Sequence, residues 1–358
     1  MGRGRAARRA GAPARLGVGA VLVPGQHPVD VIDGVAVRWH SRNKNDRRCG
    51  RVQLHLRRIR CWETAVAKTM TVFTPTYNRA YIIGRLYESL LAQTSDDFQW
   101  MVVDDGSTDD TRSVIEGFAA EGKLDIIYIH QENGGKQRAH NTGVAACDTE
   151  LFFCVDSDDA LVPTAVEDVL GLWNLRRSEP DIAGIIAMRG RSETEPMNTW
   201  FPKGLETTTM WDLYYKLHHK GDTALIYRTD ILREYPYDVV PGEKFIAETY
   251  VYHKIDQRYR LAVLNKIIWI CEYLPDGYTA HVREITRRNP VGYMRLKRDY
   301  IDYADTLTVK AQSTALYLVG AYFAGCFWRA YRELPNRLMA TLAVPVALLL
   351  VKTVYRPR

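Results

Sequence analysis

The sequence of 358 residues lacks the cysteine patterns of a zinc protein or of a disulfide-bonded one. Its six cysteines include no Cys-x-x-Cys pair, and no His/Cys cluster has the spacing of a zinc site. Such usage is typical of reduced thiols in the cytoplasm. A Gly-x-Gly-x-x-Gly sequence is also missing, which argues against the usual dinucleotide-binding loop.

Long apolar runs are missing as well. The most apolar stretch, residues 338–351, has about fourteen residues, fewer than the roughly 20 of a membrane-spanning helix, and it contains Pro345. Basic residues flank it. Two interpretations stay open: a helix packed against the protein, or an anchor on the membrane surface. We expect a cytoplasmic protein, with peripheral contact at the inner face of the plasma membrane under the second interpretation.

Charge of one sign is concentrated at the N-terminus. Residues 1–69 hold 15 Lys and Arg against 4 Asp and Glu, a net charge of about +11, whereas the whole chain is +6. The remainder is therefore about −5, which argues against nucleic acid as a partner. Because Met70 leads directly into a strand-like run, we interpret residues 1–69 as a disordered extension or as a start assigned too early, and we set them aside.

Beyond Met70 the sequence alternates between strand and helix patterns, which predicts an α/β protein with a parallel sheet. The second half adds strand-like segments separated by longer irregular stretches that are rich in aromatic residues, and the chain after Asn289 is helical to about Glu333. The predicted strands are 71–77, 98–105, 124–131, 150–159, 183–190, 223–230 and 267–273, and the predicted helices of the first half are 80–94, 110–122, 134–147 and 162–178.

Polar residues follow three of these strands, at Thr76–Asn78, Asp104–Asp105 and Asp156–Asp159. Ligands of parallel α/β sheets bind beyond the carboxyl ends of the strands. Three aspartates within residues 156–159 repel one another unless a cation neutralises them. A solvated turn is the alternative, but the two acidic strand ends together favour Mg²⁺ or a similar ion held against a diphosphate.

Four segments in this order carry a specific resemblance: Thr74–Arg79, Val102–Asp110, Asn133–Gly143 and Val155–Pro163. Together they resemble the family 2 glycosyltransferases, inverting enzymes of the GT-A fold that use nucleotide-diphosphate sugars. The resemblance is strong over residues 70–165 and looser to about residue 290. It implies a Rossmann-like, mostly parallel sheet with a nucleotide-sugar half (70–165) and an acceptor half (166–289). Beyond the resemblance, the residue pattern predicts a C-terminal helical region (290–358), and its apolar stretch is the candidate amphipathic segment for a membrane surface.

The resemblance also implies roles for single residues. In the donor site, Asp105 would accept a hydrogen bond from the base, with Asp104 as the alternative. The metal, Mg²⁺ or Mn²⁺, would bind Asp158 together with Asp156, which would also reach the sugar or ribose; we interpret Asp159 as a helix cap. The remaining donor contacts would come from Pro75, Tyr77 and Asn78 at the base and ribose, and from Lys136 and Arg138 near the base or phosphates.

An inverting transfer needs a general base that takes the proton of the acceptor hydroxyl. The resemblance places an acid at the start of a helix in the second half, and Glu248 stands at that place. Glu243 is the local rival. The alternative for Glu248 is a helix-terminal acid that interacts with the helix dipole.

The sequence thus predicts a metal-dependent inverting transfer from a nucleotide sugar, with UDP as the expected nucleotide, to a glycan or lipid-linked acceptor, as in cell-surface polysaccharide synthesis. A sugar nucleotidyltransferase is a second hypothesis, but the glycine-rich phosphate loop expected after its first strand is missing. A nucleotide-sugar-binding partner without catalysis is a third, and Glu248 argues against it.

Overall fold

The computed structural model describes residues 29–32, 35–38, 57–58, 67–197, 199–271 and 278–356. The chain divides into two units, residues 1–54 and residues 55–358. In the first unit, strands β1 (Val29–Ile32) and β2 (Val35–Arg38) pair antiparallel. Our interpretation of residues 1–69 as an extension falls almost entirely outside the described residues.

The centre of the second unit is a parallel sheet in the order β7-β4-β5-β6. These strands are β4 (Met70–Thr76), β5 (Phe98–Asp104), β6 (Ile126–His130) and β7 (Leu151–Cys154). Every residue of β4 and of β5 is buried, as expected for strands that helices cover on both faces. The predicted parallel α/β sheet is confirmed.

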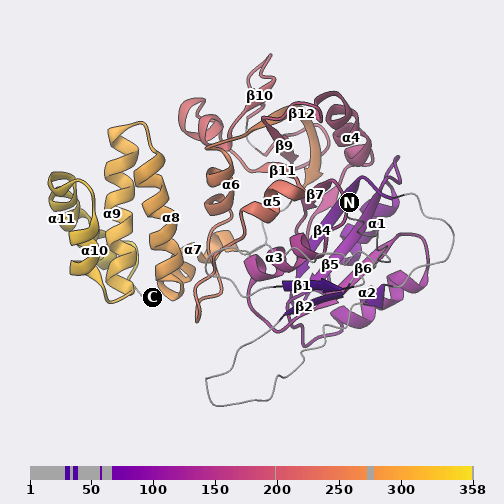
Figure 1. The fold of residues 1–358 in the computed structure, drawn as a ribbon, viewed down its shortest axis with the longest axis horizontal. Helices are drawn as coiled ribbons and strands as arrows, with labels where there is room; N and C mark the ends of the chain where they lie inside the picture. The colour runs from indigo at the N-terminus through magenta and orange to yellow at the C-terminus, as the bar shows by residue number, and fades with distance from the viewer. Residues whose placement is uncertain are drawn as a thin grey trace, which may run out of the picture. The chain divides into compact units, whose positions relative to one another are not determined.

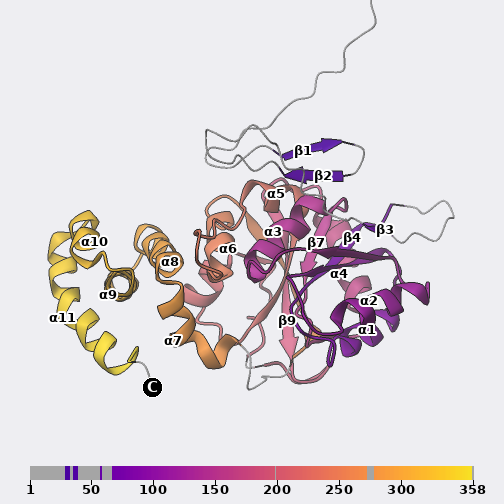
Figure 2. The ribbon, with the colours of Figure 1, turned by 90° about the horizontal axis from the view of Figure 1, so that it is seen from below.

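Five helices cover this sheet (Figures 1 and 2). In Figure 2, α3 and α5 lie on one side of the sheet, and α1 and α2 lie on the other. The fifth helix, α4, adjoins α1, because the side chain of Gln93 accepts a hydrogen bond from the backbone N–H of Val166. The helices are α1 (Gly84–Leu91), α2 (Thr111–Ala120), α3 (Lys136–Ala146), α4 (Ala165–Arg176) and α5 (Thr229–Glu234).

The second half of the chain extends the same sheet, in the order β12-β9-β11-β7. Strand β11 (Thr223–Arg228) runs antiparallel to both of its neighbours, whereas β9 (Ile182–Gly190) and β12 (Arg260–Ile270) are parallel to each other. Strands from both predicted halves therefore form one mixed sheet with a parallel centre. The short strands β3 (Arg57–Arg58), β8 (Ala160–Leu161) and β10 (Thr207–Thr208) complete it.

A second apolar core joins the C-terminal helices. They lie side by side in orange and yellow in Figure 1, and α9 packs against α8, α10 and α11. No helix in the described part of the chain is both long and apolar enough to cross a membrane. The remaining helices are η1 (Asp212–Lys216), α6 (Thr249–Ile255), α7 (Tyr278–Arg288), α8 (Pro290–Tyr303), α9 (Leu307–Phe323), α10 (Phe327–Glu333) and α11 (Arg337–Thr353).

Helix α11 continues through Pro345 and has two different faces. One face is buried through Ala340, Ala343 and Ala347, so this face is that of a packed terminal helix. The other face leaves Leu338 and Leu342 exposed. The sequence left two alternatives for this segment, a helix packed against the protein and a helix on the membrane surface. Because the two faces differ, one helix can do both.

Gly143 of α3 tests how closely the helices pack on the sheet. A Cβ at this position would collide with the ring of Phe73 in β4, whereas nothing lies near a Cβ at Gly171 in α4. We expect Gly143→Ala to lower the free energy of unfolding by about 1–3 kcal/mol through overpacking. Gly171→Ala, the matched helical control, should raise it by up to about 1 kcal/mol. Equal stability of the two variants in denaturant titrations would contradict the packing described here.

Candidate active site

A cleft of about 1060 Å³ collects side chains from segments far apart in the sequence. The ends of β4 and β7, the start of α3 and the loop before α6 all reach it. The lining includes Pro75, Tyr77, Asp105, Lys136, Asp156, Asp158, Asp159, Arg189, Tyr214, Tyr215, Asp222, Glu248 and Trp269. Residues from all three predicted strand ends, together with the predicted base, therefore face one cavity.

Asp105 shapes the loop that leads into α3. Its carboxylate accepts hydrogen bonds from the side chain of Gln131 (2.6 Å) and from the backbone N–H groups of Gly134 (2.9 Å) and Gly135 (2.7 Å). Gly135 has φ +94°, and a Cβ there would collide with the carbonyl of Lys244. Asp105 lines the cleft as expected, and its contact with a base stays a prediction.

Asp104, the alternative to Asp105, turns away from the cleft. Its carboxylate accepts hydrogen bonds from the backbone N–H of Ser107 (2.8 Å) and from the hydroxyl of Tyr128 (2.6 Å). Asp104 is buried and is not among the residues that line the cleft. The geometry therefore leaves Asp105 as the acid of this pair that a ligand in the cleft can reach.

Lys136, the first residue of α3, joins two carboxylates across the cleft. Its Nζ lies 2.5 Å from Oδ1 of Asp156 and 2.6 Å from Oε1 of Glu248. Burial alone would lower the pKa of the amine, but the two negative charges outweigh it and hold the pKa of Lys136 well above its usual range. This ammonium group fixes the acid at the end of β7 beside the acid that precedes α6.

The three aspartates after β7 differ in their electrostatic surroundings. Burial alone would raise the pKa of Asp156, but Lys136 and Arg189 hold it below its usual value. Burial and the charge of Asp156 raise the pKa of Asp158, and no ion pair between described residues engages Asp158. Burial raises the pKa of Asp159 to about 7.

Asp159 does not cap a helix, so our interpretation of it was wrong. Helix α4 begins only at Ala165, and its N-cap residue is Thr164. The chain first forms the short strand β8 against β12, and this pairing delays the helix. The carboxyl group of Asp159 is buried beside the cleft instead.

Glu243 and Glu248 are separated by the structure. The carboxylate of Glu243 accepts hydrogen bonds from the backbone N–H groups of Val291 and Gly292, both at 2.7 Å, in the first turn of α8. Glu243 is therefore buried at a helix N-terminus, where the unpaired N–H groups favour an anion. Glu248 stands at the N-cap position of α6 and lines the cleft, with 40% of its side chain exposed.

Two predicted donor residues belong to the scaffold behind the cleft. The guanidinium of Arg138 donates to the backbone carbonyls of Gly134 (2.7 Å), Glu243 (2.9 Å) and Val240 (3.1 Å). Asn78 adopts φ +54°, and its side chain accepts a hydrogen bond from the backbone N–H of Thr108 (2.7 Å). Neither residue is among those that line the cleft, in contrast to Pro75 and Tyr77.

Arg189 is a cleft residue that the sequence interpretation missed. Its guanidinium carbon lies 3.4 Å from the centroid of the Trp269 ring, and its buried Nε has no hydrogen-bond partner among the described residues. Burial alone would lower the pKa of Arg189, but Asp156 and Asp159 outweigh it and raise that pKa. The available signal was a single arginine near the end of an otherwise apolar strand.

The aromatic segment Trp211–Tyr215 contributes to the cleft through η1. Aromatic residues of this kind usually belong to a core. Trp211 does so: it is buried and stacks on Tyr215, with ring centroids 4.2 Å apart. The rings of Tyr214 and Tyr215 line the cleft. Single turns of π-helix such as η1 are frequent at functional sites.

Residues 71–236 match the family model described as glycosyl transferase family 2. The chain contains a family 2 glycosyltransferase domain. The matched range starts in β4 and ends after α5, so it holds the acidic end of β7, Lys136 and Arg189. Glu248 lies outside it.

Curated relatives of this glycosyltransferase domain are similar over part of their length. An uncharacterized glycosyltransferase from Nostoc is 32% identical over 117 residues, which are 33% of this chain and 35% of that protein. Chondroitin synthase from Escherichia coli is 39% identical over 98 residues, which are 27% of this chain and 14% of that protein. The matches thus span about a third or less of these relatives.

Solved structures similar to this chain include the TarS protein of S. aureus. Residues 1–349 of TarS in complex with UDP-GlcNAc align with a TM-score of 0.52 at 20% identity, covering 80% of this chain and 90% of that chain. At this identity the likeness shows the fold alone. The fold is GT-A, as the sequence predicted.

Asp159 makes the stability of the glycosyltransferase domain depend on pH. The pKa of Asp159 rises from 3.8 to about 7 on folding. Between these two pH values the folded protein therefore binds more protons than the unfolded protein. The resulting stabilisation is complete below pH 3.8 and is lost as the pH rises through about 7. Without metal or nucleotide, the melting temperature of Asp159→Asn relative to wild type should therefore rise between about pH 4 and pH 8. The exposed Asp110→Asn is the control, and parallel pH profiles for both variants would count against a buried, protonated Asp159.

Proposed function

We propose that this chain transfers a sugar from a nucleotide-diphosphate sugar, with UDP as the expected nucleotide, to a glycan or lipid-linked acceptor with inversion at the anomeric carbon. The observation that carries the proposal is the Lys136 bridge, which sets Asp156 and Glu248 in one cleft. The family match supports transfer as the reaction class. A related TarS structure holds UDP-GlcNAc, which favours a UDP-sugar as the donor to test first.

The donor would occupy the end of the cleft that β4 and β7 form. Pro75 and Tyr77 would border the base and ribose, and Asp105 would accept a hydrogen bond from the base with an oxygen lone pair that the loop leaves unused. Lys136 lines the same cleft and pairs with Asp156. An ammonium group at this position suits the diphosphate, whose negative charge increases as the sugar leaves.

Asp158 and Asp156 would hold a divalent ion, Mg²⁺ or Mn²⁺. In the described part of the chain, no three Asp, Glu, His or Cys residues form a group that could hold a metal ion. Mg²⁺ is commonly bound by one or two carboxylates together with substrate phosphates, and these two carboxylates fit that chemistry. Such an ion would supply Lewis-acid stabilisation of the leaving diphosphate.

Glu248 would act as the general base. As the acceptor hydroxyl attacks the anomeric carbon, its proton passes to the carboxylate of Glu248, and the electrons of the broken carbon–oxygen bond pass to the nucleoside diphosphate. The ion pair with Lys136 fixes the direction of the Glu248 carboxylate. Asp156, on the other side of Lys136, would face the sugar or ribose.

Arg189 would complete the sugar end of the cleft. A guanidinium stacked on Trp269 has little freedom to move, so its N–H groups are oriented before substrate arrives. A buried, unpartnered N–H is costly, and a hydroxyl or phosphate oxygen of a ligand would satisfy it. Tyr214 and Tyr215 are half-buried and line the cleft, and aromatic rings suit the apolar faces of sugar rings, which favours a glycan acceptor.

Nucleotide binding tests the donor site directly. UDP at about 100 times its Kd should raise the free energy of unfolding by about 2.7 kcal/mol, seen as a higher melting temperature, and Mn²⁺ or Mg²⁺ should enlarge the effect. Asp158→Asn should lose the metal-dependent part, whereas Asp110→Asn should keep it. A panel with GDP, CDP and TDP identifies the base, and a panel without any stabilisation would reject the donor site.

Glu248→Gln separates catalysis from binding. The amide keeps the size of the side chain but cannot take the proton, so we expect kcat of transfer or donor hydrolysis to fall by about 10²–10⁴, with UDP binding retained. The exposed Glu193→Gln is the control. Unchanged kcat in Glu248→Gln would show that Glu248 is not the base. Release of pyrophosphate by the wild type would favour a nucleotidyltransferase. Donor binding by the wild type without turnover would favour a non-catalytic partner.

A further inference from the structure

We propose that the exposed apolar face of α9 and α11 docks on the surface of an anionic membrane, and that lipid hydrocarbon enters the groove between these two helices. The inference deepens the proposed function, on which it rests for the acceptor, because it would bring a lipid-linked acceptor to the protein. The surface itself is argued from the C-terminal helices alone.

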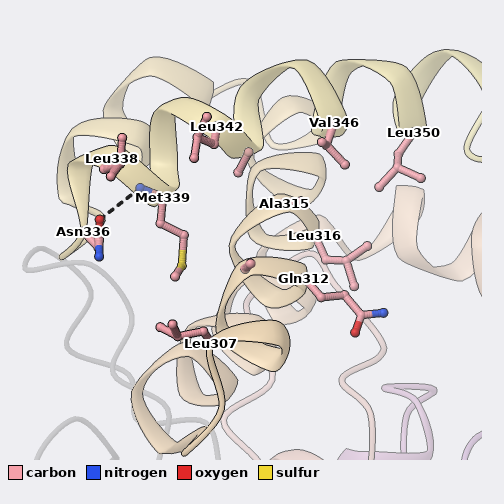
Figure 3. A pocket seen from close by; sticks show the side chains of 12 residues that line it. Leu307, Gln312, Ala315, Leu316, Asn336, Leu338, Met339, Leu342, Val346 and Leu350 are labelled. Atoms are coloured by element: carbon pink, nitrogen blue, oxygen red, sulfur yellow. Dashed lines mark hydrogen bonds between the residues drawn. The ribbon is translucent and has the colours of Figure 1, made fainter.

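The groove is almost entirely apolar. It has a volume of about 650 Å³, and Figure 3 shows side chains of α9 and α11 facing each other across it. Two polar residues line the groove, and one of them is Asn336. Its side-chain oxygen already accepts a hydrogen bond from the backbone N–H of Met339 (2.9 Å). The apolar walls come mainly from Leu307, Leu316, Leu338, Leu342, Val346 and Leu350.

The side chains at the groove are unusually exposed for their size. Leu307 is 75% exposed, Leu338 is 72% exposed and Leu342 is 65% exposed. The alanine face of α11 already packs on α9, so these leucines are not needed to hold the helices together. Contiguous apolar surface of this kind marks an interaction site.

The charge of the segment that carries the groove favours an anionic partner. Residues 307–356 contain six basic residues and one acid, Glu333, which gives a net charge of 6 − 1 = +5. This charge complements anionic lipid headgroups and opposes the approach of a second copy through the same face. Trp328 and Tyr322 are exposed in the same helical region, and such aromatic residues favour the interface between membrane and water. The six basic residues are Lys310, Arg329, Arg332, Arg337, Lys352 and Arg356.

The dimensions of α11 favour contact with the surface of a bilayer over insertion through it. Its 17 residues make a helix about 25 Å long, which is shorter than the hydrocarbon core of about 30 Å. An apolar face with basic residues near it is the arrangement of a helix that lies in the membrane interface.

Vesicle co-sedimentation of the full chain tests this surface. Wild type should bind vesicles of equal parts phosphatidylcholine and phosphatidylglycerol at least tenfold more tightly than pure phosphatidylcholine, and added salt should weaken the binding. Leu342→Glu should lower the affinity about tenfold or more, because a carboxylate then meets the anionic surface. Leu175→Glu is the matched control: Leu175 is 78% exposed on α4, and this variant should bind like wild type. Lys352→Gln should weaken binding about fivefold, on anionic vesicles only.

Three results would overturn the inference. They are absence of wild-type binding to the mixed vesicles, equal binding of Leu342→Glu and Leu175→Glu, and light scattering that shows a dimer which Leu342→Glu dissociates. UDP stabilisation measured on the same samples keeps the two proposals apart. Leu342→Glu should retain it, and its absence in wild type would reject the donor site whatever the vesicles show.

Discussion

One ammonium group, that of Lys136, connects the two parts of the candidate site. Asp156 ends a strand of the parallel sheet, and Glu248 belongs to a loop more than ninety residues later. Both carboxylates contact the same Nζ. Without a cation between them, two negatively charged carboxylates in a partly buried cleft would repel each other. With the ammonium group between them, both carboxylates hold fixed positions, as binding and proton transfer both require.

The position of Lys136 depends in turn on the sheet and on Asp105. Parallel strands β4, β5 and β7 bring their carboxyl ends to one edge, and the Asp105 carboxylate holds the N–H groups of Gly134 and Gly135 so that α3 starts beside that edge. Arg138 ties the same turn to the loop before α6 through the carbonyls of Val240 and Glu243. The loop that carries Glu248 is thereby anchored to the helix that carries Lys136.

Acids of one residue type have different roles here because their surroundings differ. The carboxylate of Asp104 accepts hydrogen bonds from Ser107 and Tyr128, whereas Asp105 lines the cleft. Glu243 holds the first turn of α8, whereas Glu248 is exposed to the cleft. Asp158 and Asp159 both have raised pKa values, but Asp159 is almost fully buried. None of these distinctions is a property of the residue itself, and each follows from neighbours that are distant in the sequence.

The sequence by itself determined the alternation of strands and helices, the parallel centre of the sheet and the acidic strand ends, because hydrophobic period and strand-end polarity are local patterns. It also placed Lys136, Asp156, Asp158 and Glu248 among the candidates. Only the tertiary structure decided that Glu248 and not Glu243 lies in the cleft, that Arg138 and Asn78 support loops behind it, and that Arg189 on Trp269 belongs to it. Those outcomes depend on which donors and charges folding brings within a few ångströms, and a linear pattern does not encode that proximity.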